Sequence, residues 1–416
     1  LWRNGDENAP VETYCMERIL FGATCSPAVA QYIKNFNANL HIKESQRAVH
    51  AIVDRHYVDD YVDCFQCEED ANKVVKEVVR IHEQGGFELR NIISNSNIVE
   101  QTCGSAENNI VERGKFLSQD KVERILGIYW LSKPDIFCFQ LKVNKQILNL
   151  SKVHTKREML SLNMSIYDPF GFLCDFMVSS KVLMQKVWKT DVNWDEELPS
   201  KIYEQWKIWL QELPKLENFR VPRCYFNNFV NYIVDLHIFA DASEEAMAAV
   251  AYWRVVCDDG IKVIFVMGKS ACAPKRYHTI PKLELQASVM AVRMKEIIIK
   301  NHLKSPNEFF FWSDYHTVIQ WIRSDHRVYK QYVANRVPEI LEGSAMRSWR
   351  WCPGVVNSED EATRAKFPKN YDADGRWKNG PDFLKEDESQ WPNESLMGNS
   401  VDNSSSELRG KSAYLI

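Results

Sequence analysis

The stretch IVDLHIFADASEEAMAAVAYWRVVCDDGIKVIFVM, residues 233–267, decides the fold. It holds three runs rich in branched and aromatic residues, which favour β-strands. Asp-Ala-Ser interrupts the pattern after the first run, and Cys257–Gly260 is a hairpin signal after the second. The sequence therefore predicts three consecutive antiparallel strands over Ile233–Asp241, Ala246–Val256 and Ile261–Met267.

The elements expected downstream extend this sheet. Pro281 opens a segment whose apolar residues lie on one helical stripe, and proline is well placed in a first helical turn. Further patterns predict a strand over 309–312, helices over 317–322 and 329–341, and a strand over 348–352. The expected result is a mixed five-stranded sheet covered by helices.

Four carboxylates occur where these elements begin or end: Asp241, Glu284, Asp314 and Asp360. Each alone has an ordinary explanation, because Asp at a strand end often forms a turn or caps a helix, and Glu in a first turn complements the helix dipole. Together they can meet at one point. Hard divalent cations take oxygen ligands, and a metal pair stabilises both the attacking and the leaving oxygen of a phosphodiester.

A run of cations precedes Glu284: Lys269, Lys275, Arg276, His278 and Lys282. Such a run is usually a solvated loop. Because the run lies beside the expected metals, phosphate binding is an equal alternative. These cations would then bind a nucleic-acid backbone independently of its sequence.

A second acidic feature lies far upstream, in residues 56–63. Asp59 and Asp60 fall between β-prone residues, which suits a strand-turn-strand with carboxylates at its tip, although an ordinary acidic turn is the alternative. Phe21 and Gly22 begin a turn before it, where glycine would let the backbone approach a nucleotide or template closely.

Composition sets limits on the chain as a whole. Its 416 residues predict two or three domains, and the net charge of −4 neither supports nor excludes a polyanion partner. Eleven scattered cysteines favour reduced thiols, and the single pair Cys64 and Cys67 lacks the second pair that a structural zinc site needs. No apolar run approaches about 18 residues, so we expect a soluble chain without a membrane partner.

The downstream motifs resemble the ribonuclease H domain of BEL/Pao retrotransposon polyproteins. Five segments carry the resemblance: Phe239–Ser243, Ile280–Ala287, Trp312–Asp314, Val333–Val337 and Asn357–Arg364.

The resemblance implies that Asp241, Glu284, Asp314 and Asp360 bind two Mg²⁺ ions, or Mn²⁺, and that the domain cuts the RNA strand of RNA/DNA hybrids. The last block departs from the family, which usually has Pro-Ala before the final Asp and Gly after the Arg. This chain has Ser358-Glu359 and Ala365 there, so an extra carboxylate at Glu359 or Glu361 could compete for the metal or crowd it.

The upstream part is similar to the palm of reverse transcriptases. Four segments in chain order carry this similarity: Phe21–Pro27, Tyr57–Asp60, Gly85–Arg90 and Ile125–Trp130. The similarity implies that Asp59 binds magnesium, that Asp60 lies beside it at the primer end, and that Phe21 and Gly22 contact nucleotide and template. Only Asp6 and Asp54 precede this pair, and neither ends a plausible strand, so we expect an incomplete polymerase.

These inferences give a multidomain α/β and α+β chain. We expect a truncated palm over 1–135, a helical thumb or connection region over 136–230, a ribonuclease H-like domain over 231–368, and a linker or disordered tail over 369–416. The expected partners are an RNA/DNA hybrid and a template-primer, with protease and integrase segments outside this chain. The expected location is intracellular, in a cytoplasmic virus-like particle or the nucleus. The alternative is a decayed or co-opted protein that binds nucleic acid without cleaving it.

Overall fold

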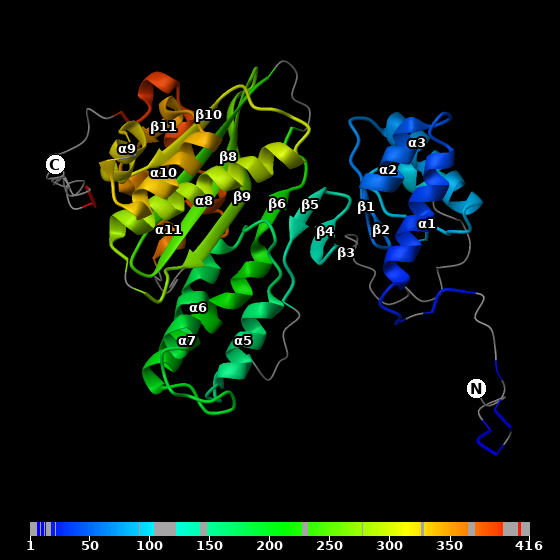
Figure 1. The fold of residues 1–416 in the computed structure, drawn as a ribbon, viewed down its shortest axis with the longest axis horizontal. Helices are drawn as coiled ribbons and strands as arrows, with labels where there is room; N and C mark the ends of the chain where they lie inside the picture. Colours follow the sequence, from blue (N-terminus) through cyan, green and yellow to red (C-terminus); the bar gives the residue numbers. More distant parts are fainter. Residues whose placement is uncertain are drawn as a thin grey trace, which may run out of the picture. The chain divides into compact units, whose positions relative to one another are not determined.

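The computed structural model divides into two compact units, residues 1–136 and 137–416 (Figure 1). It describes residues 6–8, 10–11, 13, 18–20, 22–90, 92–103, 122–141, 148–226, 232–276, 278–325, 328–364, 371–393 and 407–408. Among these residues no helix is both long and apolar enough to cross a membrane.

The first unit is mainly helical. Its elements are α1 (Ser26–Leu40), α2 (Gln46–Asp54), β1 (His56–Tyr57), β2 (Asp60–Tyr61), α3 (Glu68–Gln84), α4 (Asn97–Cys103), β3 (Val122–Ile125) and β4 (Ile128–Leu131). A small apolar core joins α1, α2 and α3 through buried side chains such as Ala38, Ile52 and Val78. Strands β1 and β2 pair antiparallel, as expected for the strand-turn-strand around Asp59.

The second unit begins with short strands and three helices. They are β5 (Ile136–Cys138), which starts at the boundary, α5 (Lys156–Ser165), α6 (Cys174–Val187), α7 (Ser200–Glu212), the 3₁₀ helix η2 (Leu213–Asn218) and β6 (Arg220–Pro222). A capping box starts α5, because Thr155 accepts from the backbone of Glu158 while the Glu158 side chain accepts from that of Thr155. Trp206 and Trp209 of α7 are fully buried and stacked on each other.

A five-stranded mixed sheet forms the centre of the second unit, which confirms the predicted fold. Its strands are β7 (Ile233–Ala242), β8 (Ala246–Cys257), β9 (Gly260–Cys272), β10 (Phe309–Ser313) and β11 (Trp349–Trp351). The spatial order is β11-β10-β7-β8-β9. The first three strands are antiparallel, whereas β10 is parallel to both β7 and β11.

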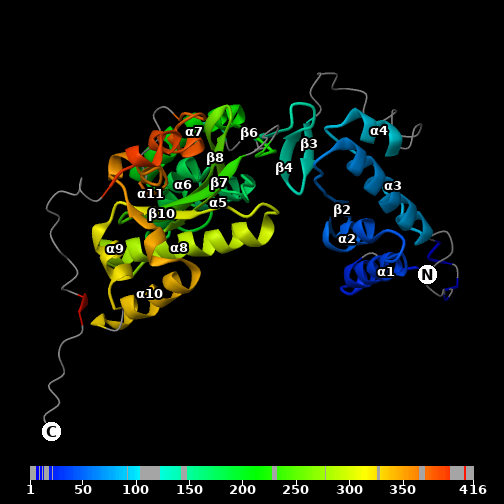
Figure 2. The same cartoon turned by 90° about the horizontal axis from the view of Figure 1, so that it is seen from above.

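Helices cover both faces of this sheet (Figure 2). The remaining helices up to residue 363 are α8 (Ile280–Asn301), α9 (His316–Arg323), α10 (Gln331–Gly343), the 3₁₀ turns η4 (Met346–Ser348) and η5 (Gly354–Val356), and α11 (Asp360–Thr363). On one face α8 packs on β7 and β8, with α10 against α8; α6 and α11 lie on the other. Side chains of a strand alternate between faces, so Leu236 and Ile238 join the α8 core while Phe239 joins the α6 core.

The connection region and the sheet share one core, so residue 230 is not a structural boundary between them. Phe172 and Trp209 belong to the same buried cluster as Phe265 of β9. The two parts also touch through backbone: Gly268 N donates to Phe170 O at 2.8 Å. Gly171 has φ +74°, and a Cβ there would lie 1.9 Å from Gly268 O, so only glycine fits.

The prediction of a linker or disordered tail is wrong for residues 371–393. This segment forms α12 (Arg376–Asn379) and the 3₁₀ turns η6 (Asp382–Lys385) and η7 (Glu388–Gln390). Trp377, Leu384 and Trp391 are buried in the shared core. The prediction failed because short turns carry no apolar periodicity, and their burial depends on partners far away in the sequence.

Candidate metal centre

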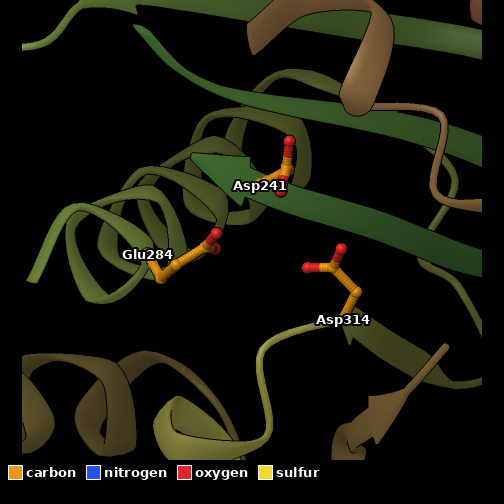
Figure 3. Close-up of side chains that lie close together, drawn as sticks. All are labelled: Asp241, Glu284 and Asp314. Carbon is orange, nitrogen blue, oxygen red and sulfur yellow. The ribbon is translucent and has the colours of Figure 1, made fainter. Parts of the chain in front are cut away.

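Three of the four predicted carboxylates meet at one edge of the sheet (Figure 3). Asp241 lies at the end of β7, Asp314 directly follows β10, and Glu284 lies just after the first turn of α8. One carboxylate oxygen from each lies within 4.8 Å of the other two. The strands are parallel neighbours, so their carboxyl ends share an edge, and α8 packs on β7 to bring Glu284 to it.

Burial makes this cluster unfavourable for anions alone. Desolvation raises the pKa of Glu284 well above its usual value, and the charges of Asp241 and Asp314 raise it further. Desolvation first, and then the charge of Asp241, raises the pKa of Asp314 to about 7. Desolvation also raises the pKa of Asp241. A bound cation would offset both causes.

Two carboxylate oxygens of the cluster suit a cation directly. Glu284 Oε2 and Asp314 Oδ1 are buried and have no hydrogen-bond partner among the described residues. Buried oxygens without a donor are costly unless an ion supplies the missing interaction. The residues therefore fit a hard divalent ion such as Mg²⁺, which takes carboxylate oxygens.

Residues around α11 hold the end of β7 in place. Thr363 Oγ1 donates to Asp241 Oδ2 at 2.5 Å, and Ser243 Oγ donates to the Thr363 carbonyl at 2.6 Å. Asn357 Nδ2 donates to Ala240 O at 3.3 Å. Thr363 and Asn357 were not predicted as site residues, although both lie in the closing block Asn357–Arg364.

The turn η5 packs directly on Asp314. A Cβ on Gly354 would lie 2.6 Å from Asp314 Oδ2. On the backbone side, Trp351 Nε1 donates to Asp314 O at 3.0 Å. Gly354 is thus a positioning residue, and its only sequence signal is the Pro-Gly turn of Pro353 and Gly354.

Asp360, the fourth predicted ligand, is not a member of the group found among the described residues. It begins α11, and its Oδ1 lies 2.6 Å from Arg364 Nε in an ion pair one helical turn apart. Its charge still raises the pKa of Asp241 and Asp314, so it lies close to the cluster. Its role as a ligand stays a prediction.

The two extra carboxylates of the closing block have different surroundings. Glu361 accepts from Arg376 Nε and Trp377 N, each at 3.1 Å, and so ties α12 to α11. Glu359 is fully buried, and burial followed by the charge of Asp241 raises its pKa well above the usual value. The sequence suggested that both could compete for the metal. Glu361 is occupied by Arg376 and Trp377, so Glu359 is the remaining candidate.

The predicted nucleic-acid-binding cations divide into two groups. Lys269, Lys275 and Arg276 are exposed. Lys282, in the first turn of α8, forms an ion pair of 2.9 Å with Glu407. Their contact with nucleic acid stays a prediction.

The upstream acidic pair lies on an exposed hairpin. Tyr57 pairs with Asp60, Asp59 occupies the turn, and Val58 has φ +57°. Among the described residues the pair forms no three-membered group of potential ligands. Gly22 has φ +90°, consistent with a turn, and Phe21 lies outside the described residues.

The family model described as the Pao retrotransposon-like RNaseH-like domain matches residues 155–315. This region is thus similar to the RNase H-like domain of Pao retrotransposons. The matched range of this Pao-type domain contains Asp241, Glu284 and Asp314 and ends before Asp360. It also begins inside the predicted connection region, which agrees with the shared core.

Two solved structures are similar to the chain. A foamy viral protease-reverse transcriptase dRH in complex with double-stranded DNA matches with a TM-score of 0.42 and 14% identity, over 79% of this chain and 49% of that one. The chain thus spans about half the length of that protein. A foamy viral protease-reverse transcriptase with double-stranded DNA matches with a TM-score of 0.20 and 13% identity, over 80% and 60%. No curated protein matches the chain.

Proposed function

We propose that this chain is a magnesium-dependent nuclease that cuts the RNA strand of RNA/DNA hybrids. The observation that carries the proposal is the buried convergence of Asp241, Glu284 and Asp314 within 4.8 Å in a Pao-type RNase H-like domain. A divalent ion at such a site would polarise the phosphodiester, activate water and stabilise the leaving 3′ oxygen.

The protein's own residues prepare this site in three ways. Asp241, Glu284 and Asp314 would hold the metal, with Asp360 as a further candidate ligand at the start of α11. Thr363 fixes the carboxylate of Asp241 through its hydrogen bond. The apolar cores on both faces of the sheet keep the strand ends rigid, which favours a preorganised site.

The direct test is cleavage of an RNA/DNA hybrid carrying a label on the RNA strand, with and without Mg²⁺. We expect Asp314→Asn to abolish cleavage. Asp259→Asn is the matched control, because it removes the same charge from the exposed turn between β8 and β9. Equal cutting by wild type and Asp314→Asn would refute the proposal.

A second candidate function is nucleic-acid binding without cleavage. The ion pair between Asp360 and Arg364 favours this second function, because Arg364 occupies a carboxylate that was predicted to bind metal. Hybrid binding that persists without any magnesium-dependent turnover would select this function.

We also propose that the first unit is similar to part of a polymerase palm and does not extend a primer by itself. Asp59 and Asp60 lie on the exposed hairpin β1–β2, and two-metal polymerisation needs a further carboxylate from another strand. Primer extension by the purified chain would contradict this proposal.

A further inference from the structure

The segment Glu407–Leu408 docks beside the candidate metal centre's helix α8. Glu407 Oε1 lies 2.9 Å from Lys282 Nζ, and Lys282 precedes Glu284 by two residues in the first turn of α8. The Glu407 residue is only 7% exposed. Its carbonyl accepts from Lys330 N at 2.8 Å, and Leu408 bridges antiparallel to Tyr329 (Figure 2, red segment near the start of α10).

The site that receives Glu407 is basic and aromatic. The ring of Tyr332 has the Arg336 guanidinium 3.5 Å from its centroid, the Lys282 ammonium at 5.6 Å and the His278 ring at 5.6 Å. Tyr332 OH donates to the carbonyl of Lys282 at 3.2 Å, and Arg336 Nε donates to Gln286 Oε1 at 2.8 Å. These contacts tie the start of α8 to α10 before any anion arrives.

One oxygen of the docked carboxylate has no donor. Glu407 Oε2 is buried without a hydrogen-bond partner among the described residues. Within the described part of the chain this carboxylate forms an ion pair with a single lysine and is incompletely satisfied, whereas a phosphate group can share its oxygens with solvent and with several cations. The site therefore accepts an anion, and Glu407 fills it imperfectly.

We propose that Lys282, beside Tyr332, binds a backbone phosphate of the nucleic-acid substrate, and that Glu407 occupies this phosphate site when no nucleic acid is bound. The inference rests on the proposed function and adds a regulatory contact to it. The strand of substrate that approaches Glu284 displaces the segment Glu407–Leu408. Displacement of the segment costs free energy, so it lowers the apparent affinity for the hybrid.

Hybrid binding by anisotropy, without divalent ions so that the probe stays intact, tests the contact separately from cleavage. The probe is a fluorescent RNA/DNA hybrid, and the variants are Glu407→Gln, Lys282→Gln and the double variant. We expect Glu407→Gln to bind about three- to tenfold more tightly, because the competing charge is gone. Lys282→Gln should bind more weakly, and Glu407→Gln should add nothing in that background.

Asp382→Asn is the matched control. It removes the same charge from an acid–lysine pair, Asp382 with Lys385 at 2.7 Å, on a side chain that is 95% exposed. If Glu407→Gln binds like wild type, gains no more than Asp382→Asn, or keeps its gain in the Lys282→Gln background, the inference is overturned.

Hydrogen exchange tests the displacement on the wild-type chain. This test does not depend on whether any variant folds. The Lys330 amide donates to Glu407 O, so its exchange should accelerate when hybrid binds. Unchanged or slower exchange at a saturating concentration of hybrid contradicts displacement. If Glu407→Gln binds the hybrid more tightly but the chain never cuts it, the phosphate-site proposal stands and the nuclease proposal fails. The two failures are therefore distinguishable.

Discussion

Gly354 shows how a residue without a side chain can determine the position of a reactive one. A Cβ at this position would lie 2.6 Å from Asp314 Oδ2, which is closer than van der Waals contact allows. We expect Gly354→Ala to move the Asp314 carboxylate and to lower the rate of hybrid cleavage about tenfold to a hundredfold, since displacements of about 1 Å have such effects. Steady-state cleavage of the labelled hybrid measures this loss.

The matched control is Val355→Ala in the same turn. Val355 is 83% exposed, so its truncation should change neither cleavage nor thermal stability. Full activity of Gly354→Ala would show that Asp314 tolerates displacement.

The protonation of Asp314 predicts how metal and pH act together on stability. Its pKa is raised to about 7 by burial and by Asp241, against about 3.9 in an unfolded chain. Between these values the folded state holds a proton that the unfolded state has released, so stability falls as pH rises. Mg²⁺ binds the deprotonated cluster, so it should raise the melting temperature more at about pH 8 than at about pH 5.

Thermal denaturation with and without Mg²⁺ at both pH values measures this difference. Asp314→Asn removes the titrating group and should reduce the effect of Mg²⁺ at the higher pH. A magnesium effect independent of pH would contradict the prediction.

The residue types of the site could be predicted from sequence, but not all of their partners. Asp241, Glu284 and Asp314 stood at element ends, and sheet topology brings such ends together. The pairing of Asp360 with Arg364 depends on rotamers in a four-residue helix. The pairing of Lys282 with Glu407 joins residues too far apart for any local pattern to show.

At the scale of elements, α12 depends on Trp377 for its attachment to the sheet. Trp377 is 1% exposed, its Nε1 donates to Phe172 O at 3.0 Å, and its ring lies 5.9 Å from that of Phe265. We expect Trp377→Ala to lower the free energy of unfolding by about 3–5 kcal/mol, the usual cost of emptying a buried aromatic site. Urea denaturation measures this change.

Trp194→Ala is the control for removing a tryptophan. Trp194 is 38% exposed, so the loss should be much smaller. Equal destabilisation by both substitutions would mean that the α12 contact contributes little.

Elements with a clear period could be predicted, and elements without one could not. Strands β7, β8 and β9 and helices α8 and α10 lie close to their expected ranges because each carries a continuous apolar run or a regular apolar stripe. The turns η6 and η7 instead attach through single contacts, such as Arg254 Nε donating to Leu384 O at 2.9 Å. Such contacts leave no periodic trace in the sequence.

For the whole molecule, the separate core of the first unit predicts a separate response to acid. His56 and His82 stack at 5.0 Å in this unit, near Lys34. Burial, followed by the charges of Lys34 and His82, lowers the pKa of His56 to about 4, against about 6.5 when unfolded. The unfolded state therefore binds the proton first, and the first unit should lose stability as pH falls from about 6.5 towards 4.

Two probes separate the units in this experiment. All of the 13 tryptophans except Trp2 and Trp130 lie in the second unit, so fluorescence reports on that unit. Hydrogen exchange of α1, α2 and α3 reports on the first. The expected result is that protection factors, which are corrected for the intrinsic pH dependence of amide exchange, fall below about pH 6 in wild type and fall less in His56→Phe. Protection factors that do not change with pH would contradict the prediction.

The close backbone contact between Gly171 and Gly268 has a practical consequence for recombinant work. An excised domain that started at residue 231 would expose Phe265 and its apolar neighbours to solvent and would be prone to aggregate. The smallest piece worth expressing therefore runs from upstream of Thr155 through Trp391. A chimera that exchanges this domain with that of a related chain would likewise have to carry both glycines together.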